Sequence, residues 1–375
     1  MNKLDVVGLT KKLISIPSWV DKKTNENAVG YFIFDYLKAN SKLKVEKQIL
    51  KGGRFNVIAK NNNLVSTLVV GHIDTVQPSV SWTKNPLKPS VGKGLLYGLG
   101  SSDMKSGVAV MLDLATNPKL KENIMFLFYA DEEYDFLGMK GFVKKYLGKI
   151  KPKQIISFDG SDLAVTNGCR GLIEISITLK GKSGHAARPE SGVNAITRSY
   201  LIINNLINWL GNYVSRELGP TTSNLAYIYG GQYQGEKDGF LILGKQGNVI
   251  ADICRFTLDI RPSRPELTAK KIINFINRET KRYNLTLMGS SVRHDLGSWS
   301  TPKELIDLNG LKLPFRSADK TGYIDLQMLW QKFGRVPCFT IGAGNSMAHK
   351  PDEYVEIDKV NKLVEIGKIL ITNDI

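Results

Sequence analysis

The stretch Gly71-His72-Ile73-Asp74-Thr75-Val76 directly follows an apolar run at residues 65–70. A short apolar run of this kind is typical of a buried strand. Side chains two positions apart on a strand point to the same face, so His72 and Asp74 should lie together where the strand ends. Ligand sites of parallel α/β sheets collect at such ends. The stretch therefore predicts a metal site, although a His-x-Asp pair can equally be two hydrogen-bonded residues that close a strand.

The chain is longer than one hydrophobic core usually supports. Single cores stop growing beyond about 250–300 residues, and this chain has 375. Residues 1–174 alternate helical and strand patterns, starting with a helix expected within residues 1–12, and they predict an α/β sheet with helices on both faces. The further patterns lie at 55–59, 65–70, 106–114, 124–130 and 155–158.

Residues 175–287 predict a second, inserted domain of the α+β class. The segment 172–179 alternates apolar and polar residues, as in a strand with one solvated face. Residues 288–375 are expected to complete the first domain, because an apolar run at 336–341 and a helical pattern at 358–370 resemble those of the first half. The remaining elements of the predicted βαββαβ insert are helices at 194–210 and 268–283 and strands at 224–229, 253–260 and 284–287.

Composition narrows the class of protein. Hydrophobic content of 42% and charged content of 23% are ordinary for a soluble globular enzyme. The formal net charge is +16, but the lysines are scattered, so no nucleic-acid partner is expected. Neither a signal-peptide pattern nor an apolar run of about 18 residues occurs, so we expect a cytoplasmic protein without a membrane partner. Cys169, Cys254 and Cys338 are widely spaced and are expected to be buried thiols.

Three acidic segments join the opening pair. Asp103 lies in a Gly/Ser-rich segment, where it could point into a site or cap the helix that follows. The triplet Asp131-Glu132-Glu133 follows a strand pattern. It could be a solvated turn, or one acid could bind a cation while its neighbour accepts a proton. Asp159 ends the next apolar run, and His294, which has no motif around it, is expected in a loop.

A second imidazole, His349, lies in the segment 342–353. Two histidines and several carboxylates without cysteine suit a pair of divalent ions, with Zn²⁺ favoured and Co²⁺ or Mn²⁺ as alternatives. Because these residues are spread from His72 to His349, only the fold can bring them together.

The order of these motifs resembles the dinuclear zinc exopeptidase and amidohydrolase family of acetylornithine deacetylase, succinyl-diaminopimelate desuccinylase, aminoacylase and carboxypeptidase G. The resemblance covers nearly the whole chain and implies a zinc-peptidase-like three-layer α/β/α catalytic domain with an inserted ferredoxin-like α+β domain for dimerisation and lid closure. It rests on Gly71-His72-Ile73-Asp74-Thr75-Val76, Asp103-Met104-Lys105-Ser106-Gly107, Asp131-Glu132-Glu133, Gly181-Lys182-Ser183-Gly184-His185-Ala186-Ala187-Arg188-Pro189, and Gly247-Asn248-Val249-Ile250 before Asp259-Ile260-Arg261.

The resemblance also implies roles for individual residues. Asp103 would bridge two Zn²⁺ ions, and Glu132 would be the general base that takes a proton from a metal-activated water. Asp74 would stay off the metal and orient His72 through the second ring nitrogen. The ligands of one ion would be His72 and Asp159, and those of the other Glu133 and His349.

The inserted domain would supply further contacts to the substrate. In relatives the histidine equivalent to His185 supports the oxyanion in the partner subunit, so the resemblance implies a homodimer. Asn248 and Arg261 would bind the carbonyl and the carboxylate of the substrate. From the residues alone, His185 could be a turn residue, and Arg261 could pair with Asp259 or Glu266.

Two features of the sequence disagree about the substrate. Asp159 stands where deacylases of this family usually carry Glu, which favours the aminopeptidase and dipeptidase branches. The length of the chain and its short insert favour the deacetylase and desuccinylase branch. The expected substrate is therefore a small peptide or an N-acyl amino acid. A specific biosynthetic deacylase is the alternative, and a catalytically silent metal- or partner-binding relative is more remote.

Overall fold

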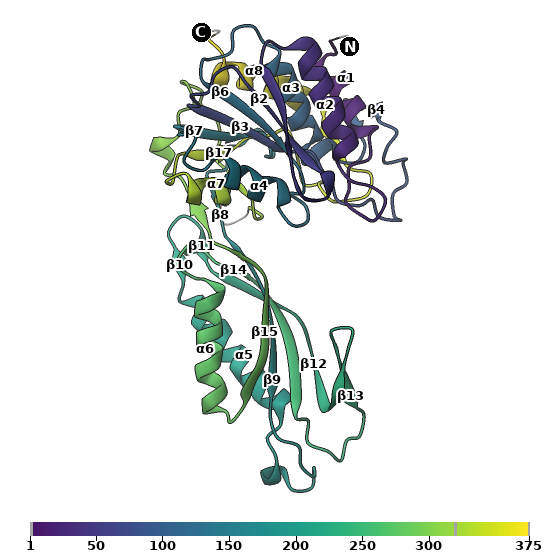
Figure 1. Cartoon of the computed structure of the whole chain (residues 1–375), viewed down its shortest axis with the longest axis vertical. Helices are drawn as coiled ribbons and strands as arrows, with labels where there is room; N and C mark the ends of the chain where they lie inside the picture. Colours follow the sequence, from purple (N-terminus) through teal and green to yellow (C-terminus); the bar gives the residue numbers. More distant parts are fainter. Residues whose placement is uncertain (1–2, 319–320, 374–375) are drawn as a thin grey trace. The chain divides into compact units, whose positions relative to one another are not determined.

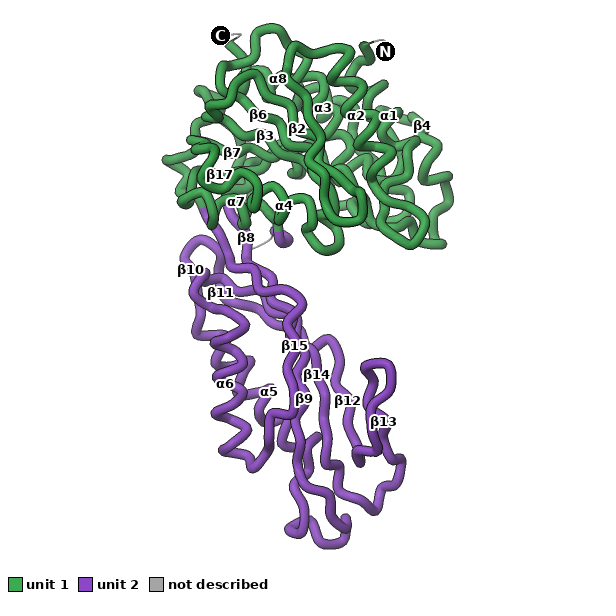
Figure 2. Tube along the Cα trace, in the orientation of Figure 1, with its two compact units in different colours: residues 1–167, 301–317, 324–375 green, residues 168–300, 318–323 purple. Residues whose placement is uncertain are grey.

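The computed structural model describes residues 3–318 and 321–373 and divides the chain into two compact units. Unit 1 comprises residues 1–167, 301–317 and 324–375, and unit 2 comprises residues 168–300 and 318–323 (Figure 2). The boundaries expected after 174 and 287 lie instead after 167 and 300. They differ because the last long strand of the insert continues to Leu296 and two short strands then pair across the junction, β8 (Gly168–Cys169) with β16 (Trp299–Ser300).

A six-stranded mixed sheet forms the centre of unit 1. Its order is β1-β2-β6-β3-β7-β17. Strands β6, β3, β7 and β17 run parallel, whereas β1 and β2 form an antiparallel edge. The strands are β1 (Lys44–Ile49), β2 (Phe55–Lys60), β3 (Thr67–His72), β6 (Ile124–Tyr129), β7 (Gln154–Ser157) and β17 (Cys338–Thr340).

Helices cover both faces of this sheet, as expected (Figure 1). Strand β2 is buried on both sides because α2 packs on one face, while Asn56 on the other donates to the carbonyl of Gly138 in α4. Helix α3 is buried almost throughout, since it lies between β3 and the outer helices α1 and α8. The helices are α1 (Val6–Ile14), α2 (Asn27–Asn40), α3 (Ser106–Ala115), α4 (Leu137–Tyr146), α7 (Leu326–Lys332) and α8 (Ile357–Ile371).

Unit 2 is a five-stranded antiparallel sheet with two helices on one face (Figure 1). The alternation at 172–179 has the predicted effect, because alternate apolar residues of β9 pack against α5 and α6 in one core. The order is β13-β12-β14-β9-β15. The elements are β9 (Leu172–Lys180), α5 (Ala195–Gly211), β12 (Thr222–Lys237), β13 (Phe240–Gly244), β14 (Ile253–Arg261), α6 (Ala269–Arg282) and β15 (Thr286–Leu296).

Two expectations for unit 2 are corrected. Strand β13 forms a hairpin with an unexpectedly long β12. His294 is not in a loop: it is buried in β15, which continues beyond residue 287. The predicted alternation ended too early here because β15 is irregular, with register shifts at 287/289 and 292/294.

Short elements complete the description. All three cysteines are buried thiols, as expected. No helix among residues 3–318 and 321–373 is long and apolar enough to cross a membrane. The short strands are β4 (Ser90–Gly92), β5 (Leu95–Tyr97), β10 (Val214–Ser215), β11 (Gly219–Pro220) and β18 (Tyr354–Glu356), and the short helical turns are Lys51–Gly53, Ser101–Lys105, Pro189–Ser191 and Lys303–Leu305.

Candidate metal centre

The sheet order brings the predicted acids and histidines to one edge. Strands β6, β3 and β7 are parallel neighbours, so their carboxyl ends meet. His72 is the last residue of β3, the triplet at 131–133 follows β6, and Asp159 follows β7. Asp103 arrives from the turn Ser101–Lys105, and His349 from the loop after β17.

Asp103 lies at the centre of this cluster. Its Oδ1 is 3.0 Å from Nε2 of His72, and its Oδ2 is 3.2 Å from Nε2 of His349. The same nitrogen of His349 lies 2.9 Å from Oε1 of Glu133. Each carboxylate oxygen of Asp103 therefore faces a different imidazole, which is the arrangement of a residue shared between two cations.

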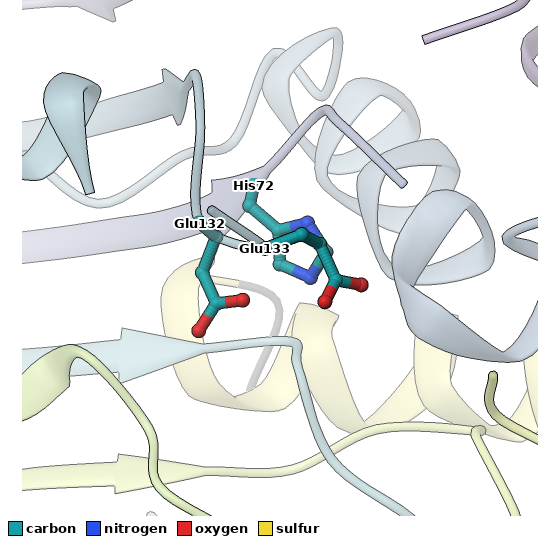
Figure 3. Close-up of side chains that lie close together, drawn as sticks. All are labelled: His72, Glu132 and Glu133. Carbon is teal, nitrogen blue, oxygen red and sulfur yellow. The ribbon is translucent and has the colours of Figure 1, made fainter. Parts of the chain in front are cut away.

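Three groups of side chains have ligand atoms within 4.8 Å of one another. Two of them share Asp103 and have the same members as the two ligand sets that the resemblance implies. The third contains Glu132, whose side chain lies beside His72 and Glu133 (Figure 3). The groups are His72–Asp103–Asp159, Asp103–Glu133–His349 and His72–Glu132–Glu133.

Asp74 makes contacts that the sequence did not indicate. Its two carboxylate oxygens accept hydrogen bonds from the backbone amides of Glu132, at 3.1 Å, and Glu133, at 3.0 Å. Nδ1 of His72 lies 3.2 Å from the backbone oxygen of Asp74 and 3.6 Å from Oδ1, which is too long for a hydrogen bond. Asp74 thus orients His72 through its carbonyl and holds the Glu132-Glu133 turn through its carboxylate.

Glu353 holds the turn that carries Asp103. The buried carboxylate accepts hydrogen bonds from the amides of Gly100, Ser102 and Asp103, at 2.7–3.0 Å. Burial raises the pKa of Glu353 to about 7, although these amides lower it. Asp103 is therefore held at two points: the two imidazoles contact its carboxylate, and Glu353 binds its backbone amide.

Arg54 binds Asp131, the first residue of the acidic triplet. Its guanidinium makes two hydrogen bonds to the fully buried Glu26, at 2.7 and 2.9 Å, and one to Asp131 at 2.6 Å. Asp131 adopts a left-handed backbone conformation, φ 71°, which is unfavourable for a residue with a side chain. The ion pair with Arg54 and a hydrogen bond from the amide of Leu137 stabilise that turn.

Removal of this anchor should destabilise the fold. We expect Arg54→Ala to lower the free energy of unfolding by about 3–5 kcal/mol, because the buried carboxylate of Glu26 loses its partner. Arg264→Ala, which breaks a surface pair with Glu266, is the matched control and should cost no more than about 1 kcal/mol. Urea unfolding of both variants measures the difference. Equal effects would contradict a structural role for Arg54.

Close backbone contact brings Asp159 toward the loop of His349. A Cβ atom on Gly342 would lie 2.3 Å from the carbonyl oxygen of Gly160, and one on Gly160 would lie 2.6 Å from the amide nitrogen of Gly342. Only glycine allows these two backbone segments to approach so closely. Backbone packing therefore constrains Gly160, which follows Asp159, and Gly342, which lies in the loop of His349. Neither glycine has a side chain that could titrate or bind a metal.

The cluster carries more negative than positive groups. Burial raises the pKa of Glu132 well above its usual range, and its acidic neighbours Asp325, Glu133 and Asp159 add to this effect. Burial and the nearby Asp103 carboxylate raise the pKa of Asp159 to about 7. Asp103 differs: burial acts to raise its pKa, but the hydrogen bonds with His349 and His72 lower it overall. Without cations, the centre must hold protons in their place.

Cation binding should release one of these protons from His349. Its hydrogen bonds with Asp103 and Glu133 raise the pKa of this imidazole to about 10, so it is protonated at neutral pH. A cation must displace that proton, so the apparent affinity for the cation should rise roughly tenfold per pH unit from about pH 7 to the pKa of about 10 and then level off. Titration calorimetry with Mn²⁺ in two buffers counts the released protons. Binding that is independent of pH, or identical proton release in His349→Ala, would contradict this expectation.

The donor set suits divalent cations. Imidazole nitrogen and carboxylate oxygen are the ligands of Zn²⁺, Co²⁺ and Mn²⁺ sites without cysteine. Asp103 offers one oxygen to each of the two His-containing groups that share it. Two cations would also neutralise the carboxylates whose pKa values burial now raises. The residues present therefore fit a dinuclear centre.

The other predicted site residues lie in unit 2. His185 and Asn248 are exposed on neighbouring loops, where the amide of Ala186 donates to the carbonyl of Asn248 at 2.9 Å. Nδ1 of His185 accepts the amide of Ala187 at 3.1 Å. Arg261 ends β14 and makes two hydrogen bonds to Asp259, at 2.7 and 3.0 Å, which is the pairing that the sequence left open.

Comparison with known proteins places the chain in a family. The model of peptidase family M20/M25/M40 matches residues 68–373, a range that includes every predicted ligand. The chain belongs to peptidase family M20/M25/M40. It is accordingly a metal-dependent hydrolase that acts on amide bonds.

Curated relatives and solved structures of family M20 agree with this assignment. Acetylornithine deacetylase of Buchnera aphidicola subsp. Acyrthosiphon pisum (strain Tuc7) is 27% identical over 92% of each chain, and that of Shigella sonnei is 28% identical over 83% of this chain and 82% of its own. The fold is similar to that of an M20 metallo-carboxypeptidase of Sulfolobus solfataricus, with a TM-score of 0.76, 16% identity and 98% coverage of both chains. A dinuclear metal binding M20 peptidase of Bacillus subtilis has a TM-score of 0.68, with 15% identity over 97% of this chain and 96% of its own.

Several residues that support this M20 centre were missed in the sequence. Arg54, Glu353, Tyr129 and Asp325 carry no recognisable local pattern, because each acts on a segment far away in the chain.

Proposed function

We propose that this M20 hydrolase cleaves the amide bond of small peptides or N-acyl amino acids at a centre of two Zn²⁺ ions, with Glu132 as the general base. The carrying observation is that Asp103 offers one carboxylate oxygen to each of two His-containing groups, with Glu132 beside them. Co²⁺ or Mn²⁺ could occupy the same donor set. His72, Asp103 and Asp159 would hold one ion, and Asp103, Glu133 and His349 the other.

When bound, two such cations lower the pKa of a water molecule and polarise the carbonyl of the scissile amide. Glu132 would accept the proton of the attacking water on its carboxylate and then deliver it to the nitrogen of the leaving amine. Its raised pKa suits the second half of this task, since a carboxyl group that holds a proton more firmly can deliver it as an acid. Asp74 would keep Glu132 in place through the amide hydrogen bond.

Residues of unit 2 would complete substrate binding. His185 would support the oxyanion of the partner subunit in a homodimer, with Asn248 on the adjoining loop binding the substrate carbonyl. The exposure of both side chains supports a role outside their own unit. Arg261 would bind a substrate carboxylate, for which it must exchange its present partner, Asp259.

Two substrate classes remain open. Asp159 favours a peptidase, and so does similarity to a tripeptidase of Staphylococcus aureus, with a TM-score of 0.74 and 20% identity over 99% of this chain and 98% of its own. The curated acetylornithine deacetylases favour the alternative, a biosynthetic deacylase that acts on acetylornithine, acetyl-lysine or succinyl-diaminopimelate. A catalytically silent relative is a remote third reading.

One assay separates these possibilities. The Zn²⁺- or Co²⁺-loaded protein is incubated with a mixture of di- and tripeptides and N-acyl amino acids, and mass spectrometry identifies the depleted compounds. Depletion of peptides supports the peptidase, and depletion of N-acyl diamino acids alone supports the deacylase. If no amide is cleaved although two ions are bound, the silent relative is the correct interpretation. Glu132→Ala serves as the control for contaminating hydrolases.

A further inference from the structure

Asp325 is a buried carboxylate that has no step of its own in the proposed reaction, although its charge adds to the raised pKa of Glu132. It directly precedes α7 and is 1% exposed. An acid at this position usually caps the helix, but the side chain of Asp325 makes no capping hydrogen bond. Its Oδ1 accepts the hydroxyl of Tyr129 at 2.8 Å. Its Oδ2 has no hydrogen-bond partner among the described residues.

Such a group is costly to bury. A carboxylate without full hydrogen bonding loses its hydration and gains too little in return. Burial accordingly raises the pKa of Asp325 to about 7. An apolar side chain of similar size would avoid this cost. The residue that Asp325 contacts is therefore the place to look for its role.

Tyr129 connects Asp325 to the metal centre. It is the last residue of β6, it is buried, and it lies opposite His72 in the register of β3 and β6. The ring of Tyr129 meets the imidazole edge to face, with centroids 6.3 Å apart and planes at 62°. Without its hydroxyl bond to Asp325, this ring would lose the contact that fixes its tilt beside His72.

We propose that Asp325 is a positioning residue that acts through the hydroxyl of Tyr129 on the imidazole of His72. The contact would set the affinity for the ion of the His72–Asp103–Asp159 group and leave the ion of the Asp103–Glu133–His349 group largely unaffected. The inference rests on the proposed two-ion function, because it assigns the effect to one ion of the pair. Indirect partners of metal-bound histidines have effects of this kind in other proteins.

The hydrogen bond and the negative charge of Asp325 can be separated by substitution. Asp325→Leu and Tyr129→Phe both remove the hydrogen bond. Asp325→Asn removes the charge but keeps an amide oxygen that can accept the hydroxyl. Asp113→Asn, which removes a partly buried charge in α3 away from the cluster, is the matched control for loss of charge alone.

Stepwise titration of each metal-free variant with Co²⁺, followed by its absorption spectrum, measures the two affinities independently of turnover. We expect Asp325→Leu and Tyr129→Phe each to weaken the affinity for one of the two ions by about 10- to 100-fold. The double variant Asp325→Leu/Tyr129→Phe should have the same affinity as the single variant that binds Co²⁺ less tightly, since both changes break the same contact. The two Co²⁺ affinities of Asp325→Asn and of Asp113→Asn should stay within about threefold of those of the wild type.

Each alternative outcome is distinct. Additive effects of the two substitutions, equal weakening of both ions, or unchanged affinities in folded Tyr129→Phe would overturn the inference. Tyr129→Phe keeps the test valid if Asp325→Leu does not fold. A wild-type protein that binds fewer than two ions would instead contradict the proposed function. Wild-type binding of two ions with unchanged Tyr129→Phe affinities would leave that function intact.

Discussion

Glu132→Ala should lower kcat by about 10²–10⁴-fold while two ions per chain remain bound. The carboxylate of Glu132 lies beside His72 and Glu133, but it belongs to neither of the two groups that share Asp103 (Figure 3). Its loss should remove the proton acceptor and leave the ligands in place. Steady-state kinetics together with metal analysis by mass spectrometry measures both quantities on the same sample.

Two further variants sharpen this test. Glu122→Ala removes an exposed acid just before β6 and should retain full activity. Glu132→Gln keeps the size of the side chain and should be as inactive as the alanine variant, because the amide cannot accept the proton. Substantial turnover by either Glu132 variant would show that another group is the base. Loss of one ion would make Glu132 a ligand instead.

Asp103→Ala should have the second large effect, the loss of both ions. Each oxygen of Asp103 faces a different imidazole, so its removal weakens both groups at once. We expect metal content to fall from two ions to less than one, and kcat to fall about 10³-fold or more. His349→Ala is the informative comparison, because it belongs to one group only and should remove a single ion. Two tightly bound ions in Asp103→Ala would contradict the shared role.

The position of the centre followed from the sequence because it depends on strand ends. His72, the triplet at 131–133 and Asp159 each end an apolar run, and parallel strands bring such ends together. The resemblance supplied the roles of Asp103 and His349, whose approach depends on loops. The structure places all of these side chains together, and it pairs them in the two groups that the resemblance implied.

The supporting contacts could not be predicted in the same way. The carboxylate of Asp74 was expected to hold the ring of His72, yet it binds the amides of Glu132 and Glu133. That geometry depends on the left-handed backbone of Asp131, which is stabilised by Arg54, a residue 77 positions away in the sequence and just before β2. Hydrogen bonds between backbone amides and remote carboxylates leave no periodic pattern in a sequence.

The inserted domain shows which strands could not be located from the sequence pattern. Regular alternation located β9 and β14, whereas β13 and the end of β15 were missed. Strand β15 contains register shifts, and β13 pairs with a bulged part of β12, so the period of two is interrupted in β15 and in the partner of β13. The domain boundaries shifted because β15 continues to Leu296 and β8 then pairs with β16 across the junction.

Reconstitution of the metal-free protein tests the central claim most directly. The protein is treated with a chelator, titrated with Zn²⁺ or Co²⁺, and assayed for hydrolysis of the substrate identified in the mixed assay, with bound metal measured at each step. The account predicts no hydrolysis without metal and full activity when two ions per chain are bound. Full activity in the metal-free protein, or at a single bound ion with no further metal uptake, would contradict it.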